Sequence, residues 1–230
     1  MTHQLPSNTV HLWTGQFDRL HTKRAEFESL LTDDERKRAE RFISDMVRDK
    51  FILARGWLRT VLSQYLDQSP ESIVFTYGKR GKPSIHNSDI HFNLSHSDNV
   101  LMLGVIKDRE IGVDVEQIHP QPNMALIAHD NFSAKEFTAL YELPETERLH
   151  AFYNCWTRKE AYIKAVGDGF ALPLQDFDVT LKPDTPPRFL RIKDDDPAKW
   201  SLLHIDTLDD AIGAVCVKGA MPQIKLMPPL

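Results

Sequence analysis

Acidic and apolar residues alternate in the string from Ile111 to Glu116, which reads IGVDVE. A β-strand places successive side chains on opposite faces, so Asp114 and Glu116 share a face with Gly112, and the glycine leaves room there for a bulky group. Carboxylate oxygens suit Mg²⁺, which proteins commonly bind through a few carboxylates together with the phosphates of a substrate. The string therefore indicates either a magnesium site or, more plainly, a solvated strand end.

A third acidic residue stands close to a lysine in a later stretch of helical spacing. Glu160 and Lys164 are four residues apart, so both lie on one face of a helix, and the glycines from Gly167 onward are suited to end that helix. As a surface salt bridge the pair contributes only about a few tenths of a kcal/mol. As a functional pair, Glu160 adds a third acid to a metal site, and Lys164 stabilises negative charge that moves onto a leaving group.

The polar segment 95–99 separates two strand-like runs. Ser95 and His96 lie where the first run is expected to end, so their donors face either solvent or a phosphate. His86, His91 and His96 recur at every fifth position, which puts neighbours on opposite faces of a strand. A zinc site built from these histidines is therefore not expected.

Basic residues gather between Arg36 and Arg59. Within this segment Arg48, Arg55 and Arg59 are spaced at i, i+7 and i+11, which places them on one side of a helix. The segment is either a solvated helix face or a stripe of guanidinium groups that faces phosphates.

The chain has 230 residues, with 28 basic and 33 acidic side chains and a formal net charge of −5. Its length suits one large domain or two small halves. The acidic balance argues against general nucleic-acid binding, the apolar runs are too short to span a membrane, and the N-terminal segment lacks the pattern of an export signal. Cys155 and Cys216 form no CxxC pair, which predicts two reduced thiols in a cytoplasmic protein.

The expected elements repeat along the chain. Thr32 to Glu35 and Ser133 to Glu136 both have the pattern of a capping box, and each is followed by a helical stretch and then by strands. The strands are expected at 10–13, 73–77, 90–94, 100–106, 111–116, 177–181, 200–205 and 212–217, the long helices around 51–65 and 152–166, and a turn at 78–83.

The same order recurs at an offset of roughly 100–110 residues, which predicts an internal duplication. Two α+β halves follow, 1–107 and 108–230, each with helices on one face of an antiparallel sheet and with a ligand groove between them. The proline-rich segment 182–199 and the tail after Val217 are expected to be exposed and loosely held.

Four strings taken together resemble, in order and spacing, the 4′-phosphopantetheinyl transferases of the longer, Sfp type. They are Gly81-Lys82-Pro83, Phe92 to Ser97, Ile111 to Glu116, and Trp156 to Gly169. The resemblance implies a monomer of two similar α+β halves in a pseudo-two-fold arrangement. It also implies an enzyme that moves the phosphopantetheine arm of coenzyme A onto a serine of an acyl or peptidyl carrier protein, in fatty-acid, polyketide or non-ribosomal peptide synthesis, and releases 3′,5′-ADP.

The resemblance also assigns roles to residues. It implies that Mg²⁺ is held by Asp114, Glu116 and Glu160, that Lys164 stabilises the departing 3′,5′-ADP, and that Glu160 or a metal-bound water takes the serine proton. The implied contacts to coenzyme A are Lys82, Pro83, Ser95 and His96 for the diphosphate and adenine, and Arg38, Arg48 and Arg55 for the 3′-phosphate.

Two further points follow from the same resemblance. The carrier protein is expected to dock beside the metal, against the segment that follows Gly167. Some relatives have a threonine near positions 51–52, where this chain has Phe51 and Ile52, so no hydroxyl contact is expected there.

Two other functions fit the same residues. One is a Mg²⁺-dependent nucleotide or phosphoanhydride hydrolase that uses the same three acids. The other is an inactive module that only binds carrier proteins, although the presence of all three acids and of Lys164 argues against it.

Overall fold

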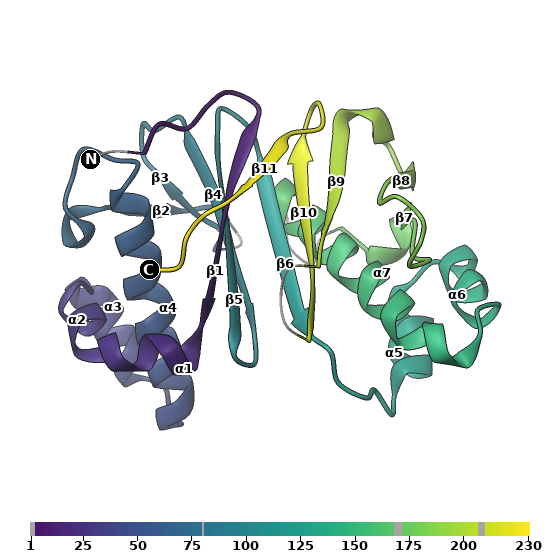
Figure 1. The fold of residues 1–230 in the computed structure, drawn as a ribbon, viewed down its shortest axis with the longest axis horizontal. Helices are drawn as coiled ribbons and strands as arrows, with labels where there is room; N and C mark the ends of the chain where they lie inside the picture. The colour runs from purple at the N-terminus through teal and green to yellow at the C-terminus, as the bar shows by residue number, and fades with distance from the viewer. Residues whose placement is uncertain (1–2, 80, 168–171, 207–209) are drawn as a thin grey trace.

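Four layers stack across the molecule, with two sheets in the middle and helices outside them (Figure 1). The structure is a computed structural model and describes residues 3–79, 81–167, 172–206 and 210–230. The strands are β1 (Thr9–Gln16), β2 (Phe75–Tyr77), β3 (Pro83–Ile85), β4 (Ile90–Ser97), β5 (Val100–Lys107), β6 (Ile111–Gln117), β7 (Phe177–Val179), β8 (Phe189–Ile192), β9 (Trp200–Ile205), β10 (Ala211–Lys218) and β11 (Gln223–Leu226). The helices are α1 (Phe17–Leu20), α2 (Arg24–Ser29), α3 (Asp33–Glu40), α4 (Asp45–Ser63), α5 (Met124–Asn131), α6 (Ala134–Tyr141) and α7 (Glu145–Val166).

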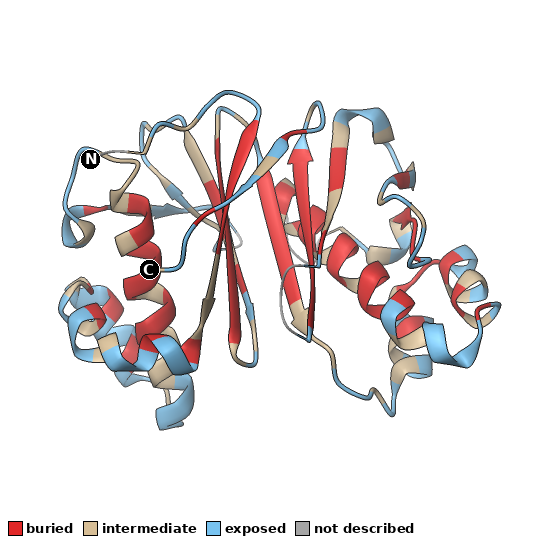
Figure 2. Cartoon of the chain, in the orientation of Figure 1, coloured by how far each residue is buried: buried red, intermediate tan, exposed pale blue. Residues whose placement is uncertain are grey.

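The two main sheets pack face to face through a core of branched apolar side chains. One sheet has the order β11-β1-β5-β4 and the other β6-β10-β9. Val113 and Val115 of β6 are fully buried in this core together with Val10 of β1 and Val215 of β10. The central strands are accordingly buried along most of their length (Figure 2). The alternation that predicted a two-faced strand at β6 is confirmed, because its apolar face is the one that meets the other sheet.

The two long helices cover the outer faces of the sheets. Helix α4 packs Trp57 and Val61 onto the first sheet. Helix α7 packs Ala161 and Ala165 onto the second, against Ala214 of β10. Helix α7 is longer than expected because it begins at Glu145, and it ends as expected, since the next residue, Gly167, has a φ of 78° that ends the helix.

The halves repeat their element order in space as well as in sequence. Strand order β1-β5-β4 in the first sheet matches β6-β10-β9 in the second, and the small hairpins β2–β3 and β7–β8 occupy the same place in each series. Both predicted capping boxes form, at Thr32 with Glu35 and at Ser133 with Glu136. The fold is therefore of the α+β class, and its topology supports the duplication.

A buried ion pair of the same design stabilises each half. In the first, the guanidinium of Arg59 forms a bidentate contact of 2.9 Å with the capping-box carboxylate of Glu35 and lies 5.0 Å from the ring of Phe75. In the second, the ammonium of Lys159 lies 2.8 Å from Glu136 and 4.3 Å from the ring of a phenylalanine in β7. Each cation also donates to two backbone carbonyls that precede or begin the small hairpin.

The structure corrects four local expectations, each because a strand pairing extends further than the sequence pattern indicated. Strand β4 continues to Ser97, so Ser95 and His96 lie in a strand paired with β5 and not in a loop. The turn expected through Pro83 ends earlier, because β3 pairs with β2 from that residue onward. The segment 182–199 contains β8, whose Phe189 and Ile192 are buried against α7 and its neighbours.

The tail after Val217 is the fourth case. It returns to the first sheet as β11, which runs parallel to β1 and occupies its free edge. The last residues of the chain therefore pack with the first half, although they follow the predicted boundary at 107/108 in sequence. The division of the chain at this boundary remains a prediction.

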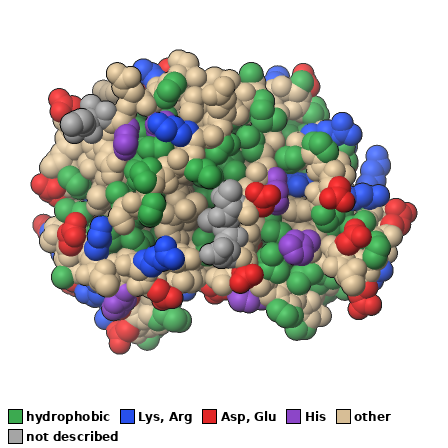
Figure 3. Space-filling view, in the orientation of Figure 1, with side chains coloured by type: hydrophobic (Ala, Val, Ile, Leu, Met, Phe, Trp, Pro, Cys, Tyr) green, Lys and Arg blue, Asp and Glu red, His purple; other side chains and the backbone are tan. Residues whose placement is uncertain are grey.

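The described ranges contain no helix that is both long and apolar enough to cross a membrane. On the face shown in Figure 3, acidic and basic side chains are interspersed rather than gathered in one large area of either sign.

Candidate active site

The edge strand β6 brings its acidic face against helix α7. A β-carbon added to Gly112 would lie 2.0 Å from the carbonyl oxygen of Ala161 and 2.3 Å from the backbone nitrogen of Ala165. The space expected beside Gly112 is therefore filled by the helix backbone and not by a ligand. This close approach carries the acidic and basic residues of α7 to the next positions of the strand, Asp114 and Glu116.

Asp114 lies at the centre of the site and is buried. Its Oδ1 accepts hydrogen bonds from Ser95 Oγ at 3.0 Å and from the ammonium of Lys164 at 2.6 Å. Its other oxygen, Oδ2, is buried and has no hydrogen-bond partner within the described ranges. Burial raises the pKa of Asp114 to about 6, and the Lys164 ammonium counteracts part of that rise. A buried carboxylate oxygen without a partner is costly unless a cation approaches it.

Glu116 and Glu160 complete the acidic group. Burial raises the pKa of both carboxyls, and each also feels a like charge, Glu116 that of Asp114 and Glu160 that of Glu116. The Lys164 ammonium lowers the pKa of both. The ammonium of Lys164 thus contacts Asp114 and also affects the pKa of Glu116 and Glu160, so all three carboxylates predicted from sequence interact electrostatically with one lysine near the junction of β6 and α7.

The donor set fits a hard divalent cation. It offers carboxylate oxygens from Asp114, Glu116 and Glu160, and Oδ2 of Asp114 is free to accept one. In the part of the chain that the structure describes, however, no group of three or more acidic, histidine or cysteine side chains is placed closely enough to hold a metal ion. The ammonium of Lys164 lies against Asp114 instead.

A groove leads away from Lys164 between the two halves. A pocket of about 220 Å³ is lined by Lys164 and Ile163 of α7, by Asn93 of β4, and by Lys82 of the turn before β3. A second pocket of about 420 Å³ continues past Lys82 along β3 and β4, with Pro83 in its wall. Lys82 and Gly167 line both pockets, so the two depressions adjoin at these residues.

Lys82 joins the two halves at the middle of this groove. Its ammonium donates to the carbonyls of Ile111 and Ala165 at 3.0 Å each and lies 3.4 Å from Glu110. Burial lowers its pKa, and Glu110 counteracts that shift. The ammonium predicted to meet phosphates thus also fixes the start of β6 to the end of α7.

Ser95 and His96 lie on opposite faces of β4. Ser95 points to Asp114, whereas the His96 ring lies edge-on to Phe17 at a centroid distance of 5.6 Å. Desolvation lowers the pKa of His96, and the ammonium groups of Lys164 and Lys50 lower it further. His96 therefore leaves the strand on the face opposite to Ser95, although the charge of Lys164 still affects its pKa.

The arginines predicted to face phosphates occupy different surroundings. Arg55 is mostly buried, lies over the ring of Phe51 together with Arg38, and has one guanidinium nitrogen, Nη1, without a hydrogen-bond partner among the described residues. Arg48 donates to Asp45 and to the carbonyl of Phe42, which lies before the start of α4.

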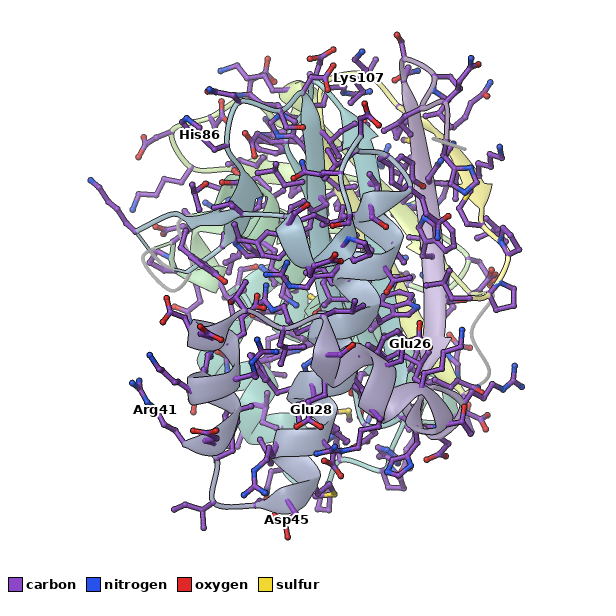
Figure 4. All side chains as sticks on the ribbon, turned by 90° about the vertical axis from the view of Figure 1, so that its left-hand side faces the viewer. Glu26, Glu28, Arg41, Asp45, His86 and Lys107 are labelled. Atoms are coloured by element: carbon purple, nitrogen blue, oxygen red, sulfur yellow. The ribbon has the colours of Figure 1, made fainter. Side chains whose placement is uncertain are left out.

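Arg59, the third member of the predicted stripe, is turned into the core by Glu35 and does not face a ligand. The stripe is therefore not continuous. Figure 4 looks onto these helices, with Arg41 and Asp45 at one end of α4 and His86 and Lys107 at the other end of the molecule.

Sequence reasoning missed one contact at the site. Ser97 Oγ donates to Oε2 of Glu116 at 2.6 Å. The polar residues Asn93, Ser95 and Ser97 alternate along the chain, as they would on one face of a strand. This pattern could have predicted the contact, but the strand was expected to end before Ser95, so Ser97 was placed in a loop. The segment after Gly167, where a carrier protein is expected to dock, begins at 168–171, outside the described residues.

Comparison with known proteins adds three findings. The sequence profile of the 4′-phosphopantetheinyl transferase superfamily matches residues 110–216. The 4′-phosphopantetheinyl transferase HetI of Nostoc sp. is 36% identical over 219 residues, which cover 94% of this chain and 90% of HetI. The 4′-phosphopantetheinyl transferase Sfp of Bacillus subtilis is 31% identical over 159 residues, 69% of this chain and 70% of Sfp.

Among solved structures, a holo-(acyl-carrier-protein) synthase of Bacillus anthracis in complex with CoA (3′,5′-ADP) matches with a TM-score of 0.40 and 18% identity. The match covers 48% of this chain and 96% of that one.

Proposed function

The chain belongs to the 4′-phosphopantetheinyl transferase family, and we propose that it works with Mg²⁺ held by Asp114, Glu116 and Glu160. It is an enzyme that moves the 4′-phosphopantetheine arm of coenzyme A to a serine of an apo carrier protein and releases 3′,5′-ADP. A bond forms between the serine oxygen and phosphorus while the phosphoanhydride bond to 3′,5′-ADP breaks. The reaction therefore needs a base for the serine proton, positioning, and stabilisation of the negative charge that leaves.

The single observation that carries the metal proposal is the carboxylate of Asp114. It is buried at the junction of the halves with one oxygen bound to Lys164 and the other without a partner among the described residues. When bound, Mg²⁺ neutralises diphosphate charge and polarises the bond that breaks. Glu116 and Glu160 supply the remaining carboxylates from the strand and the helix.

Lys164 is suited to stabilise the leaving group. Its ammonium lies at the open end of the groove and is kept there by hydrogen bonds to Asp114 and Ser95. A positioned ammonium in a partly desolvated groove stabilises developing phosphate charge without reorganisation.

Glu160 is the residue we assign as the base. Burial and the nearby Glu116 raise its pKa above that of an ordinary glutamate, which makes the carboxylate a better proton acceptor. Its place on α7, one turn before Lys164, puts the acceptor of the serine proton next to the group that stabilises the leaving charge.

The groove supports the remaining assignments for coenzyme A. We propose that Lys82, which lines both pockets, contacts the diphosphate, and that Pro83 in the wall of the larger pocket packs near adenine. Ser95 and His96 line neither pocket; we propose them as further contacts to the diphosphate because Ser95 bonds to Lys164. For the 3′-phosphate we propose Arg38, Arg48 and Arg55; Nε of Arg48 and Nη1 of Arg55 are both buried without a hydrogen-bond partner among the described residues, which favours these two.

The carrier protein and the oligomeric state complete the proposal. We propose that the enzyme works as a monomer, because one chain supplies both sides of the site. The first half supplies Ser95 on β4, and the second half supplies Asp114 and Lys164. We propose that the carrier protein approaches from the second half beside Glu160.

The proposal is tested by incubating an apo carrier protein with coenzyme A, Mg²⁺ and the enzyme, and weighing the carrier by mass spectrometry. Transfer adds one phosphopantetheine arm to the carrier, and removal of Mg²⁺ by a chelator stops the gain. A carrier of unchanged mass, with coenzyme A cleaved, indicates a hydrolase. Full transfer in the presence of the chelator removes the metal from the proposal.

A further inference from the structure

The turn that joins β4 to β5 in the first half touches the end of β6 in the second. Ser97 Oγ donates to Oε2 of Glu116 at 2.6 Å. The neighbouring Asp98 lies 2.6 Å from the ring nitrogen Nε2 of His119, just beyond the strand. The end of β6 that carries Glu116 is therefore contacted by the other half of the molecule.

These contacts continue a regular arrangement between the two strands. Ser95 of β4 donates to Asp114 of β6, and Ser97 of β4 donates to Glu116 of β6, so the partners are 19 residues apart in both pairs. Strands β4 and β6 therefore run in the same direction. Strand β4 pairs its backbone with β5 and β6 pairs its backbone with β10, so side chains carry the contact between β4 and β6.

The two carboxylates differ in how they are fixed. Asp114 has a short side chain, is buried, and is held by both Ser95 and Lys164. Glu116 has a longer side chain with more rotatable bonds, is only partly buried, and is oriented by the hydroxyl of Ser97. A flexible ligand gains the most from a partner that restricts its rotamers before the ion arrives.

We propose that Ser97 is a positioning residue for Glu116, holding Oε2 so that Oε1 is presented to the cation. The inference rests on the proposed function, because it assigns to Glu116 the role of a metal ligand. It adds that the first half prepares the metal site of the second half through one hydroxyl at the end of β4. The loss of this hydroxyl should weaken metal binding while the fold remains, because Ser97 is partly exposed and water can replace it at the strand end.

The test compares Ser97→Ala, Ser97→Thr and Ser29→Ala in the full chain. Ser29 is a matched control, because its exposed hydroxyl donates a hydrogen bond of the same 2.6 Å length, to a helix carbonyl. Mn²⁺ binding is measured by electron paramagnetic resonance in the presence of coenzyme A, and thermal melting checks the fold. We expect Ser97→Ala to bind Mn²⁺ at least about 10-fold more weakly, Ser97→Thr to restore most of the affinity, and Ser29→Ala to match the wild type.

A second measurement separates positioning from general damage. Transfer by Ser97→Ala should require more Mg²⁺ for half-maximal rate, and kcat should recover when Mg²⁺ is saturating. Wild-type Mn²⁺ affinity in Ser97→Ala, or a loss of kcat that no Mg²⁺ concentration restores, overturns the inference while the proposed function stands. Wild-type protein that binds no Mn²⁺ with coenzyme A overturns both.

Discussion

The ammonium of Lys164 lies 2.6 Å from Oδ1 of Asp114, and this contact joins the long helix of the second half to the edge strand that faces the first half. The pair is asymmetric, because the carboxylate is buried while the lysine side chain keeps 29% of its exposure. When Asp114 is removed, the lysine can therefore reach water, whereas the site loses its central anion.

Asp114→Ala should abolish transfer and leave the fold intact. The variant loses the buried oxygen that we assign to the metal, and we expect the rate to fall by at least about 100-fold. The melting temperature should change little for two reasons. Lys164 is partly exposed, so its ammonium can be solvated once the carboxylate is gone, and the raised pKa of Asp114 shows that its burial already disfavours the charged form. Carrier mass spectrometry and a thermal melt measure the two effects; transfer at the normal rate would contradict the metal assignment.

Glu160→Gln should also stop transfer. The amide keeps the size and helix position of the side chain but cannot accept the serine proton, and we expect a loss of at least about 100-fold in kcat. Glu147→Gln is the matched control, since it makes the same change on an exposed turn of α7 and should retain the wild-type rate. Equal rates for the two variants would exclude Glu160 from the chemistry.

Gly112→Ala should be strongly destabilising. The added methyl would lie 2.0 Å from the carbonyl oxygen of Ala161, so α7 has to move away from β6. We expect a loss of at least about 3 kcal/mol in the free energy of unfolding, together with the loss of transfer. Gly78→Ala is the control, because the nearest atom to its added methyl is 3.8 Å away. Denaturant unfolding of both variants measures the difference, and similar stabilities would contradict the close packing.

Arg59→Met should destabilise the first half by about 3–5 kcal/mol. It removes the guanidinium that contacts the carboxylate of Glu35 through two hydrogen bonds of 2.9 Å, and leaves only the more distant guanidinium of Arg55, at 3.5 Å, to balance that charge. The double variant Glu35→Gln with Arg59→Met removes both charges and should recover part of that loss. If the double variant is no more stable than Arg59→Met, the penalty does not come from the loss of the charge that Arg59 supplies to Glu35.

His11 should make the protein less stable in acid. Burial lowers its pKa from 6.5 to about 4, and the positive charges of Lys225 and His3 add to the shift. Between these values the unfolded chain binds the proton and the folded chain does not, so stability falls as pH drops from about 6.5 to about 4. The neutral ring also contacts the hydroxyl of Tyr65 through Nδ1, at 2.9 Å.

The measurement is the difference in melting temperature between wild type and His11→Gln, followed from pH 7 downward. Wild type should lose more stability than the variant over this interval, and parallel curves would show that His11 does not titrate with unfolding.

The sequence predicted those features that depend on neighbours in the chain. The alternation around Asp114, both capping boxes and the end of α7 at Gly167 all follow from local patterns, and the structure confirms them. Contacts between segments distant in the chain were not predictable in this way. Spacing alone cannot show that Arg59 turns into the core toward Glu35, because that depends on the packing of α3 against α4.

The extent of β4 shows the same limit at the site itself. Polar residues from Ser95 onward suggested a loop, yet β5 provides backbone partners as far as Ser97, and β6 provides carboxylates for the serine hydroxyls. A polar strand end becomes favourable only when its partners are present. Here the backbone partners come from β5 of the same half, and the side-chain partners come from β6 of the other half.

The matching ion pairs of the two halves show which residues correspond between them. They align Arg59 with Lys159, so the next residue, Thr60, stands where the second half has Glu160. The Thr60 hydroxyl bonds to the carbonyl of Gly56 in its own helix, and the neighbouring strand β1 has its free edge occupied by β11. The first half therefore has no acid at the position that corresponds to Glu160, and its strand β1, the counterpart of β6, contains no aspartate or glutamate. A single acid introduced at position 60 should therefore not create a second metal site, because the strand beside it supplies no further carboxylate and its outer edge is paired with β11.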